Sequence, residues 1–200
     1  MEKESKVKKV TLDTNCIVSL EINDGNAFYI RELIKLHLEK KTKLGVVAIS
    51  GSERNRERNY PNNYNEFQKR LENAGLENVD ILLPMLYWDI CFWDHGLLTN
   101  DQMEKLEREI HEILFPNIEY DIKKFCEINN LDLEDKNSPL YQKWINMKCD
   151  VQMIWAHIYH KRDIFVTDDD NYRKESKLPA LIKLAAGQIF KPKDVLQFLS

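Results

Sequence analysis

The chain of 200 residues has few of the residues that mark fibrous or disordered proteins. It contains six glycines and six prolines, while 43% of its residues are hydrophobic and 31% are charged. This composition excludes a collagen-like repeat, a disordered chain and a coiled-coil array. At this length one compact core is expected, so we predict a single domain over residues 1–200.

Closely spaced cysteines are also missing. The four cysteines, Cys16, Cys91, Cys126 and Cys149, lie far apart and form no C-x-x-C pair. Neither they nor the histidines have the spacing of metal ligands, which excludes a zinc or redox-active site. We therefore expect reduced thiols and a cytoplasmic location.

Long apolar runs are missing as well. The apolar runs of the chain, such as residues 81–83 and 164–166, are far shorter than the about 20 residues that cross a bilayer. The N-terminal sequence MEKESKVKKV lacks the apolar core of a signal peptide. We expect no association with a membrane.

The sequence has no excess of positive charge. It has 29 Lys and Arg residues against 33 Asp and Glu residues, a net charge of 29 − 33 = −4. Proteins that coat DNA are usually basic, so any contact with nucleic acid must come from local basic patches. One candidate is the alternating series Arg54, Arg56 and Arg58, which follows the second expected strand. Its arginines could contact phosphate or pair with Glu53 or Glu57, and both interpretations stay open.

Short β-branched runs that alternate with long helical patterns predict an α/β fold, with a central, mostly parallel sheet flanked by helices. Strands are expected over residues 7–12, 46–49, 79–83, 164–167 and 188–190. Helical patterns cover residues 17–38, 101–114, 118–128, 138–161 and 181–186, with a last turn after Pro192. Within this single domain, residues 59–137 are expected to form a mainly helical insertion.

Acidic residues follow several of the expected strands. Asp13 comes directly after the first strand, Glu53 and Glu57 follow the second, and Asp168 and Asp169 follow the fourth. Ligands of open parallel sheets bind outside the carboxyl ends of the strands. Carboxylates gathered there would repel one another unless a divalent cation lay between them, and oxygen ligands favour Mg²⁺ or Mn²⁺ over zinc.

Asp150 is a further candidate because it lies within a helical pattern among the apolar residues Met147, Val151 and Ile154. Burying a carboxylate without a partner costs several kcal/mol, on the order of 3 or more. Structural roles remain open for the other acids: Asp13 could cap a helix, Glu53 could close a capping box, and Asp168 could lie in a solvated turn.

The order and spacing of these acids resemble the PIN-domain family of metal-dependent ribonucleases. Residues 10–15, V-T-L-D-T-N, resemble the first motif of that family. Residues 150–156, D-V-Q-M-I-W-A, and residues 165–172, F-V-T-D-D-D-N-Y, resemble its third and fourth motifs. The resemblance covers about residues 7–58 and 138–199 and leaves the middle segment without a counterpart.

The resemblance implies roles for individual residues. Asp13, Asp150 and Asp169 match the first, third and fourth acids of the family, with Asp168 as the neighbouring alternative to Asp169. The second acid is Glu53 or Glu57, of which we prefer Glu53. Supporting side chains that bind carboxylates or substrate phosphate are then Thr14, Asn15 and Thr167. Asn171 stands where the family often has an additional Asp.

The function implied by the resemblance is hydrolysis of RNA phosphodiester bonds by an endoribonuclease that holds one or two Mg²⁺ or Mn²⁺ ions. The resemblance allows single-stranded RNA as a substrate. It also leaves open an antitoxin or another regulatory protein as a partner, and an oligomeric state. Two alternatives remain: an inactive PIN-like RNA-binding or scaffold domain, and a Mg²⁺-dependent phosphatase. Asn15 argues against the phosphatase because it replaces the second acid of a D-x-D motif.

Overall fold

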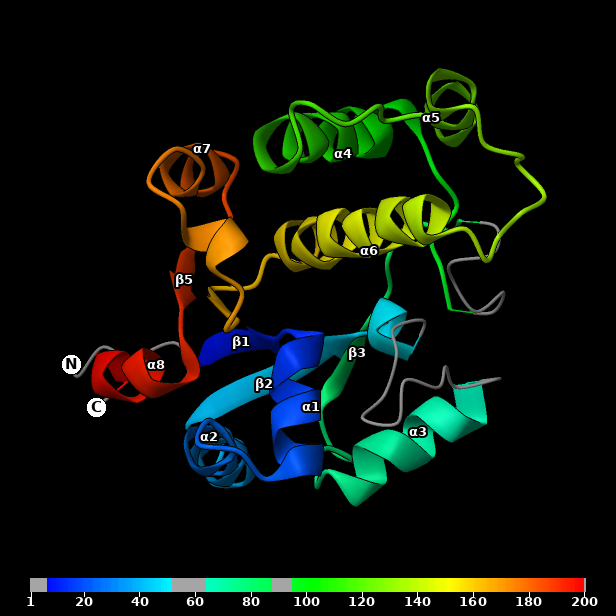
Figure 1. Ribbon diagram of the computed structural model, residues 1–200. Coiled ribbons are helices and arrows are strands. Elements are labelled where there is room, and N and C mark those ends of the chain that lie inside the picture. The colour runs from blue at the N-terminus through cyan, green and yellow to red at the C-terminus, as the bar shows by residue number, and fades with distance from the viewer. Residues whose placement is uncertain (1–6, 52–63, 88–94, 200) are drawn as a thin grey trace.

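The computed structural model describes residues 7–51, 64–87 and 95–199, and its centre is a five-stranded parallel sheet (Figure 1). The strand order is β3-β2-β1-β4-β5, and every neighbouring pair is parallel. The strands are β1 (Lys8–Leu12), β2 (Thr42–Val47), β3 (Asp80–Leu82), β4 (Ile164–Val166) and β5 (Gln188–Phe190). The predicted α/β fold is therefore confirmed.

Helices cover both faces of this sheet. On one face lie α1 (Thr14–Ile22), α2 (Ala27–Leu38), α3 (Tyr64–Asn73) and α8 (Pro192–Leu199). On the other lie α6 (Pro139–Tyr159), α4 (Asp101–Leu114), α7 (Leu178–Lys183) and α5 (Ile122–Asn129), with α6 between the sheet and α4 in Figure 1. Two short 3₁₀ turns, η1 (Ala48–Gly51) and η2 (Asp170–Arg173), follow β2 and β4. Among the described residues, no helix is both long and apolar enough to span a membrane.

The strands are apolar on both faces because each face packs into its own core. Val10, Leu12 and Val46 are fully buried against α1, α2 and α3. Val47 and Phe165 point to the opposite face and are fully buried against α6. Strands enclosed in this way have continuous apolar runs, which is the pattern that predicted them.

The single helical pattern over residues 17–38 forms two helices. Asn23 ends α1 in the left-handed conformation, with φ 54°, and its N–H bonds the carbonyl of Ser19. Asparagine tolerates this conformation well, so it is a frequent helix end. A short turn follows before α2 begins at Ala27.

The expected insertion over residues 59–137 is not confirmed, because its described part contributes to both cores. β3 lies in this segment and pairs with β2, with Val46 opposite Ile81. Phe67 of α3 is buried on one face of the sheet, and Ile110 of α4 is buried on the other. Periodicity alone does not show that such elements pack onto the common sheet.

A buried ion pair joins α4 to α6. Glu107 Oε1 lies 2.7 Å from Lys148 Nζ, and both side chains are almost completely buried. Gln152 donates to the same oxygen at 2.8 Å, and the hydroxyls of Tyr87 and Tyr120 donate to Oε2. Both charges therefore have partners, and the cluster fixes α4 against α6.

Candidate active site

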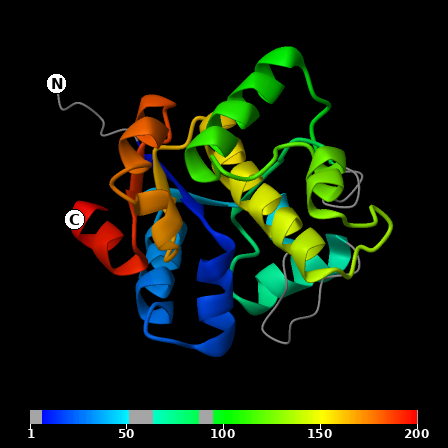
Figure 2. The ribbon, with the colours of Figure 1, turned by 45° about the horizontal axis from the view of Figure 1, so that its top comes forward.

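Asp13 lies at the carboxyl end of β1, where Figure 2 shows the strand running directly into α1. It is only 6% exposed. Its Oδ1 accepts a hydrogen bond from the N–H of Thr14 at 2.7 Å, so Asp13 does cap α1. Its Oδ2 accepts from Asn15 Nδ2 and from Thr167 Oγ1, both at 2.5 Å. Capping therefore uses only one oxygen of this carboxylate.

Burial raises the pKa of Asp13 from 3.8 to about 6. The hydrogen bonds from Thr167, Thr14 and Asn15 lower the pKa, while the negative charge of Asp169 raises it. Desolvation therefore outweighs the hydrogen bonds. Thr167 links the two acids, because its hydroxyl donates to Asp13 and accepts from the N–H of Asp169.

Asn15 and Thr167 join the ends of β1 and β4. Asn15 Nδ2 donates to Thr167 Oγ1 at 2.9 Å, and Asn15 Oδ1 accepts from the N–H of Asp168 at 3.1 Å. Thr167 Oγ1 also accepts from the N–H of Asp169 at 3.0 Å. The supporting role expected for both residues toward Asp13 is thus present, and they also set the position of residues 168–169.

The three consecutive acids after β4 differ in their surroundings. Asp168 is exposed, and Asp170 pairs with Arg173 and with Lys191. Asp169 is half-buried, and its Oδ1 accepts from the N–H of Asn171 at 2.8 Å. Its charge also acts on Asp13, which favours Asp169 over Asp168 as the acid of this site.

Lys177 is a site residue that the sequence analysis missed. Its Nζ donates to Asn171 Oδ1 and to the carbonyl oxygen of Leu114, both at 2.5 Å. Burial and the charge of Lys174 lower the pKa of Lys177, whereas Asp169 raises it. Lys177 therefore ties η2 to the end of α4. No spacing signal could reveal this, since Leu114 lies 63 positions away.

Asp150 is half-buried on α6, and its backbone carbonyl accepts from the hydroxyl of Tyr172 at 3.0 Å. This contact places α6 beside η2. Within residues 7–51, 64–87 and 95–199, however, no three His, Cys, Asp or Glu side chains form a group that could hold a metal ion. A common metal site for Asp13, Asp150 and Asp169 thus remains a prediction.

Four predicted site residues, Glu53, Glu57, Arg54 and Arg56, lie outside the described residues, as does Arg58. The end of η1, which precedes them, is fixed beside Asp13. Ser50 Oγ accepts from Thr14 Oγ1 at 2.8 Å, and the Ser50 carbonyl accepts from Arg70 Nη1 at 3.1 Å. Arg70 is itself held by Glu21 at 2.6 Å. Thr14 thus connects the ends of β1 and η1.

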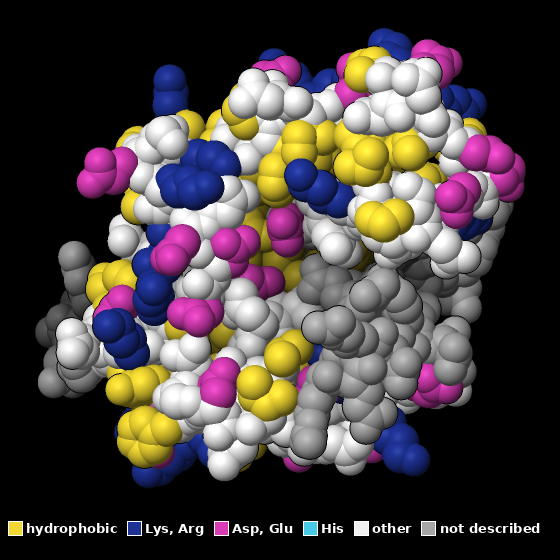
Figure 3. All heavy atoms as spheres, viewed as in Figure 1, with side chains coloured by type: hydrophobic (Ala, Val, Ile, Leu, Met, Phe, Trp, Pro, Cys, Tyr) yellow, Lys and Arg dark blue, Asp and Glu magenta, His cyan; other side chains and the backbone are white. Residues whose placement is uncertain are grey.

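In the view of Figure 3, acidic side chains gather around a hollow over η2 and α6. The donors of Asp13 and Asp169 are oxygen atoms, which suits Mg²⁺ or Mn²⁺ better than zinc. Burial is the main cause of the raised pKa of Asp13, and the negative charge of Asp169 adds to it. Repulsion of this kind between carboxylates is relieved by a divalent cation. These two residues therefore fit a divalent cation in chemistry.

Comparison with models of known protein families finds no match for this chain, and no curated protein sequence matches it. The fold and the site define an α/β protein with a buried carboxylate and a second acid at the carboxyl edge of a parallel sheet.

Proposed function

We propose that this protein is a metal-dependent nuclease of PIN type that hydrolyses phosphodiester bonds of RNA. The observation that carries the proposal is the environment of Asp13. This acid is buried at the carboxyl end of the central strand and accepts hydrogen bonds from Asn15 and Thr167. Burial raises its pKa, and the charge of Asp169 raises it further. Keeping a buried acid beside a second acid costs stability, so such an arrangement is typical of functional sites.

Asp13 and Asp169 would hold Mg²⁺ or Mn²⁺, together with Asp150 and with Glu53 or Glu57. A bound ion of this kind lowers the pKa of water and stabilises negative charge on phosphate. The residues of the chain itself supply orientation. Asn15 and Thr167 fix one oxygen of Asp13, and Thr167 also fixes the backbone of Asp169.

The choice of RNA rests on the PIN resemblance of residues 10–15, 150–156 and 165–172. Asn15 supports a nuclease over a phosphatase with an aspartyl nucleophile. In such a phosphatase the residue at this position supplies a carboxylic acid, whereas the Asn15 amide binds Asp13, Thr167 and the N–H of Asp168.

One observation favours the alternative of an inactive PIN-like RNA-binding or scaffold domain. The described residues contain no group of three metal-ligating side chains. On the nuclease proposal, a residue of the segment that carries Glu53 and Glu57 completes the set. On the scaffold proposal, RNA binds and is not cleaved.

The test is cleavage of end-labelled RNA and DNA oligonucleotides of equal sequence with Mg²⁺, with Mn²⁺ and with chelator. We expect RNA cleavage that requires metal and falls at least about 100-fold in Asp13→Asn and Asp169→Asn, the range seen when a charge-stabilising group is removed. Glu127→Gln, which changes an exposed acid of α5, is the matched control and should be fully active.

Other outcomes separate the alternatives. Cleavage that persists in chelator or in Asp13→Asn contradicts the proposal. RNA binding without cleavage supports the scaffold domain. Release of phosphate from a simple phosphomonoester, without cleavage of the oligonucleotides, supports the phosphatase.

A further inference from the structure

The segment that follows Asp169 and Asp170 is strongly basic although the chain is acidic. Residues 171–193 contain six basic residues and one acidic residue, a net charge of +5, whereas the whole chain has −4. We call these residues the basic strip. Its basic members are Arg173, Lys174, Lys177, Lys183, Lys191 and Lys193.

The fold places the basic strip beside the candidate active site. Lys177 binds Asn171 at 2.5 Å and interacts with Asp169. Lys191 Nζ lies 3.4 Å from Asp170 Oδ1, and Arg173 pairs with the same carboxylate. Figure 3 shows Lys and Arg side chains over α7 and where β5 meets α8, next to the acidic hollow.

Part of this positive charge is available for a ligand. Lys174 and Lys193 are exposed, and neither has an acidic side chain within ion-pair distance among the described residues. The charge of Lys174 also acts on Lys177, so its cation lies close to the site.

The composition of the strip favours a nucleic acid over a protein as its partner. Within residues 171–193 one large hydrophobic side chain, that of Ile182, is exposed, with 43% of its surface accessible. Protein interfaces have an apolar, aromatic-rich centre, whereas surfaces that bind nucleic acids are polar and strongly positive. Cations along one side of an acidic site match a phosphate chain that runs past it.

We propose that the basic strip binds the sugar–phosphate backbone of the RNA strand and leads it to Asp13 and Asp169. The inference rests on the proposed nuclease function for the identity of the strand. It assigns Lys174 and Lys193 to phosphate contacts outside the reacting centre.

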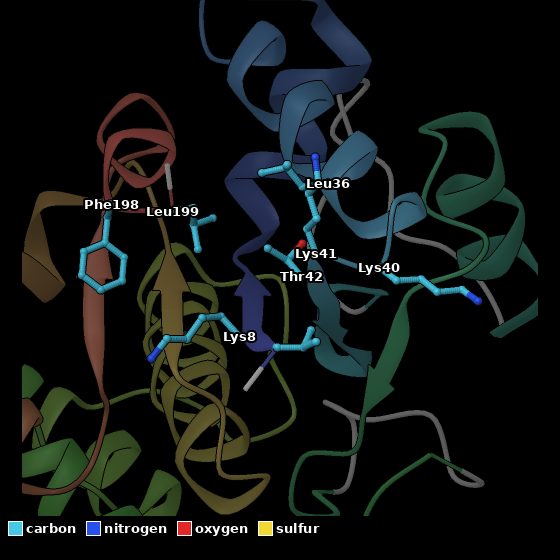
Figure 4. Close-up of a pocket in the computed structure, with 8 residues that line it drawn as sticks. Lys8, Leu36, Lys40, Lys41, Thr42, Phe198 and Leu199 are labelled. Carbon is cyan, nitrogen blue, oxygen red and sulfur yellow. The ribbon is translucent and has the colours of Figure 1, made fainter. Parts of the chain in front are cut away.

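A second basic group provides a matched control. Lys8, Lys40 and Lys41 surround a pocket of about 550 Å³ at the start of β1 and β2, the sheet edge opposite Asp13. Figure 4 shows that the side chains of Lys8 and Lys40 point in different directions rather than toward one point. Both are exposed and, among the described residues, lack an acidic partner. Replacing both by glutamate therefore changes the total charge by the same amount as replacing Lys174 and Lys193 by glutamate.

The experiment measures binding of a fluorescein-labelled oligouridylate to the full chain by fluorescence anisotropy, in chelator, over a series of NaCl concentrations. We expect K174E/K193E to bind at least about 10-fold more weakly than wild type at low salt, and K8E/K40E to bind within about 2-fold of it. The salt dependence should fall by a slope of about 1.4, that is about 0.7 for each lost contact to a single strand.

Three results would overturn the inference: no binding of oligouridylate by wild type, equal effects of the two double variants, or displacement of the RNA by polyglutamate of equal length. Thermal unfolding verifies that each variant is folded, and K174Q/K193Q replaces the reversal if K174E/K193E is not. Because binding is measured without metal, the two proposals fail separately. Strip-dependent binding without cleavage would refute the nuclease, and cleavage with unchanged binding in K174E/K193E would refute the strip.

Discussion

The guanidinium group of Arg162 lies directly over Gly45, and its Nη2 would be 2.8 Å from a Cβ atom at that position. The same Nη2 donates to the carbonyls of Val10 and Lys43, and Nη1 donates to Asp80 at 2.8 Å. Arg162 therefore connects three adjacent strands, β1, β2 and β3, and Gly45 provides the space in which it does so.

This contact predicts that Gly45→Ala destabilises the protein by about 2 kcal/mol, because the methyl group displaces a buried, hydrogen-bonded guanidinium. Urea unfolding measures the effect. Gly25→Ala is the control, since a Cβ there meets nothing within 4 Å, and its effect should stay within about 0.5 kcal/mol. If Arg162 causes the loss, Gly45→Ala should be much less harmful in an Arg162→Ala background.

The raised pKa of Asp13 predicts how stability depends on pH. Between 3.8 and about 6 the native state holds a proton that the unfolded state has lost, so the contribution of Asp13 to stability falls as pH rises through this window. Above it, the buried charge costs about 3 kcal/mol, since each pKa unit corresponds to about 1.4 kcal/mol.

Asp13→Asn should therefore unfold at a higher temperature than wild type at pH 7.5 without metal, with a difference that shrinks toward pH 4. The altered hydrogen bonds to Asn15 and Thr167 offset part of this gain. Added Mn²⁺ should stabilise wild type and leave Asp13→Asn unchanged. Calorimetry of both proteins and of the control Glu127→Gln tests this, and an equal effect of pH on wild type and Asp13→Asn would refute it.

The buried pair of Glu107 and Lys148 predicts strongly non-additive variants. Lys148→Met leaves a buried carboxylate without its cation and should cost about 3–5 kcal/mol. The double variant Glu107→Gln, Lys148→Met removes both charges and should be clearly more stable than Lys148→Met alone. Urea unfolding of the full cycle measures this coupling, and additive losses would show that the pair contributes little.

The two hydrogen bonds of Lys177 predict that it holds η2 in place. Lys177→Met should speed amide hydrogen exchange in residues 168–173 and lower the rate of RNA cleavage about 10-fold, because Asp169 loses its fixed position. Lys123→Met, at an exposed lysine of α5 outside the basic strip, is the control for lost charge. Unchanged exchange in Lys177→Met would contradict the positioning role, whatever the cleavage rate.

Local sequence pattern determined much of this protein. β5 over Gln188–Phe190 and α4 over Asp101–Leu114 have the bounds that the pattern predicted. The order of strands and helices also predicted a parallel sheet, and with it the edge where Asp13 and Asp169 lie. These features follow from periodicity and from residues that end helices, both of which act over a few neighbouring positions.

The tertiary structure decided what depends on residues far apart in the chain. The second strand was predicted to begin at residue 46, yet Gly45 lies inside β2, where the guanidinium group of Arg162 occupies the space beside it. Lys177 lies beside the site because it donates hydrogen bonds to Leu114 and Asn171. Residues of the expected insertion form part of the central sheet and pack into both of its cores. Such contacts form only when the chain is packed, since their partners are set by the fold and not by spacing along the sequence.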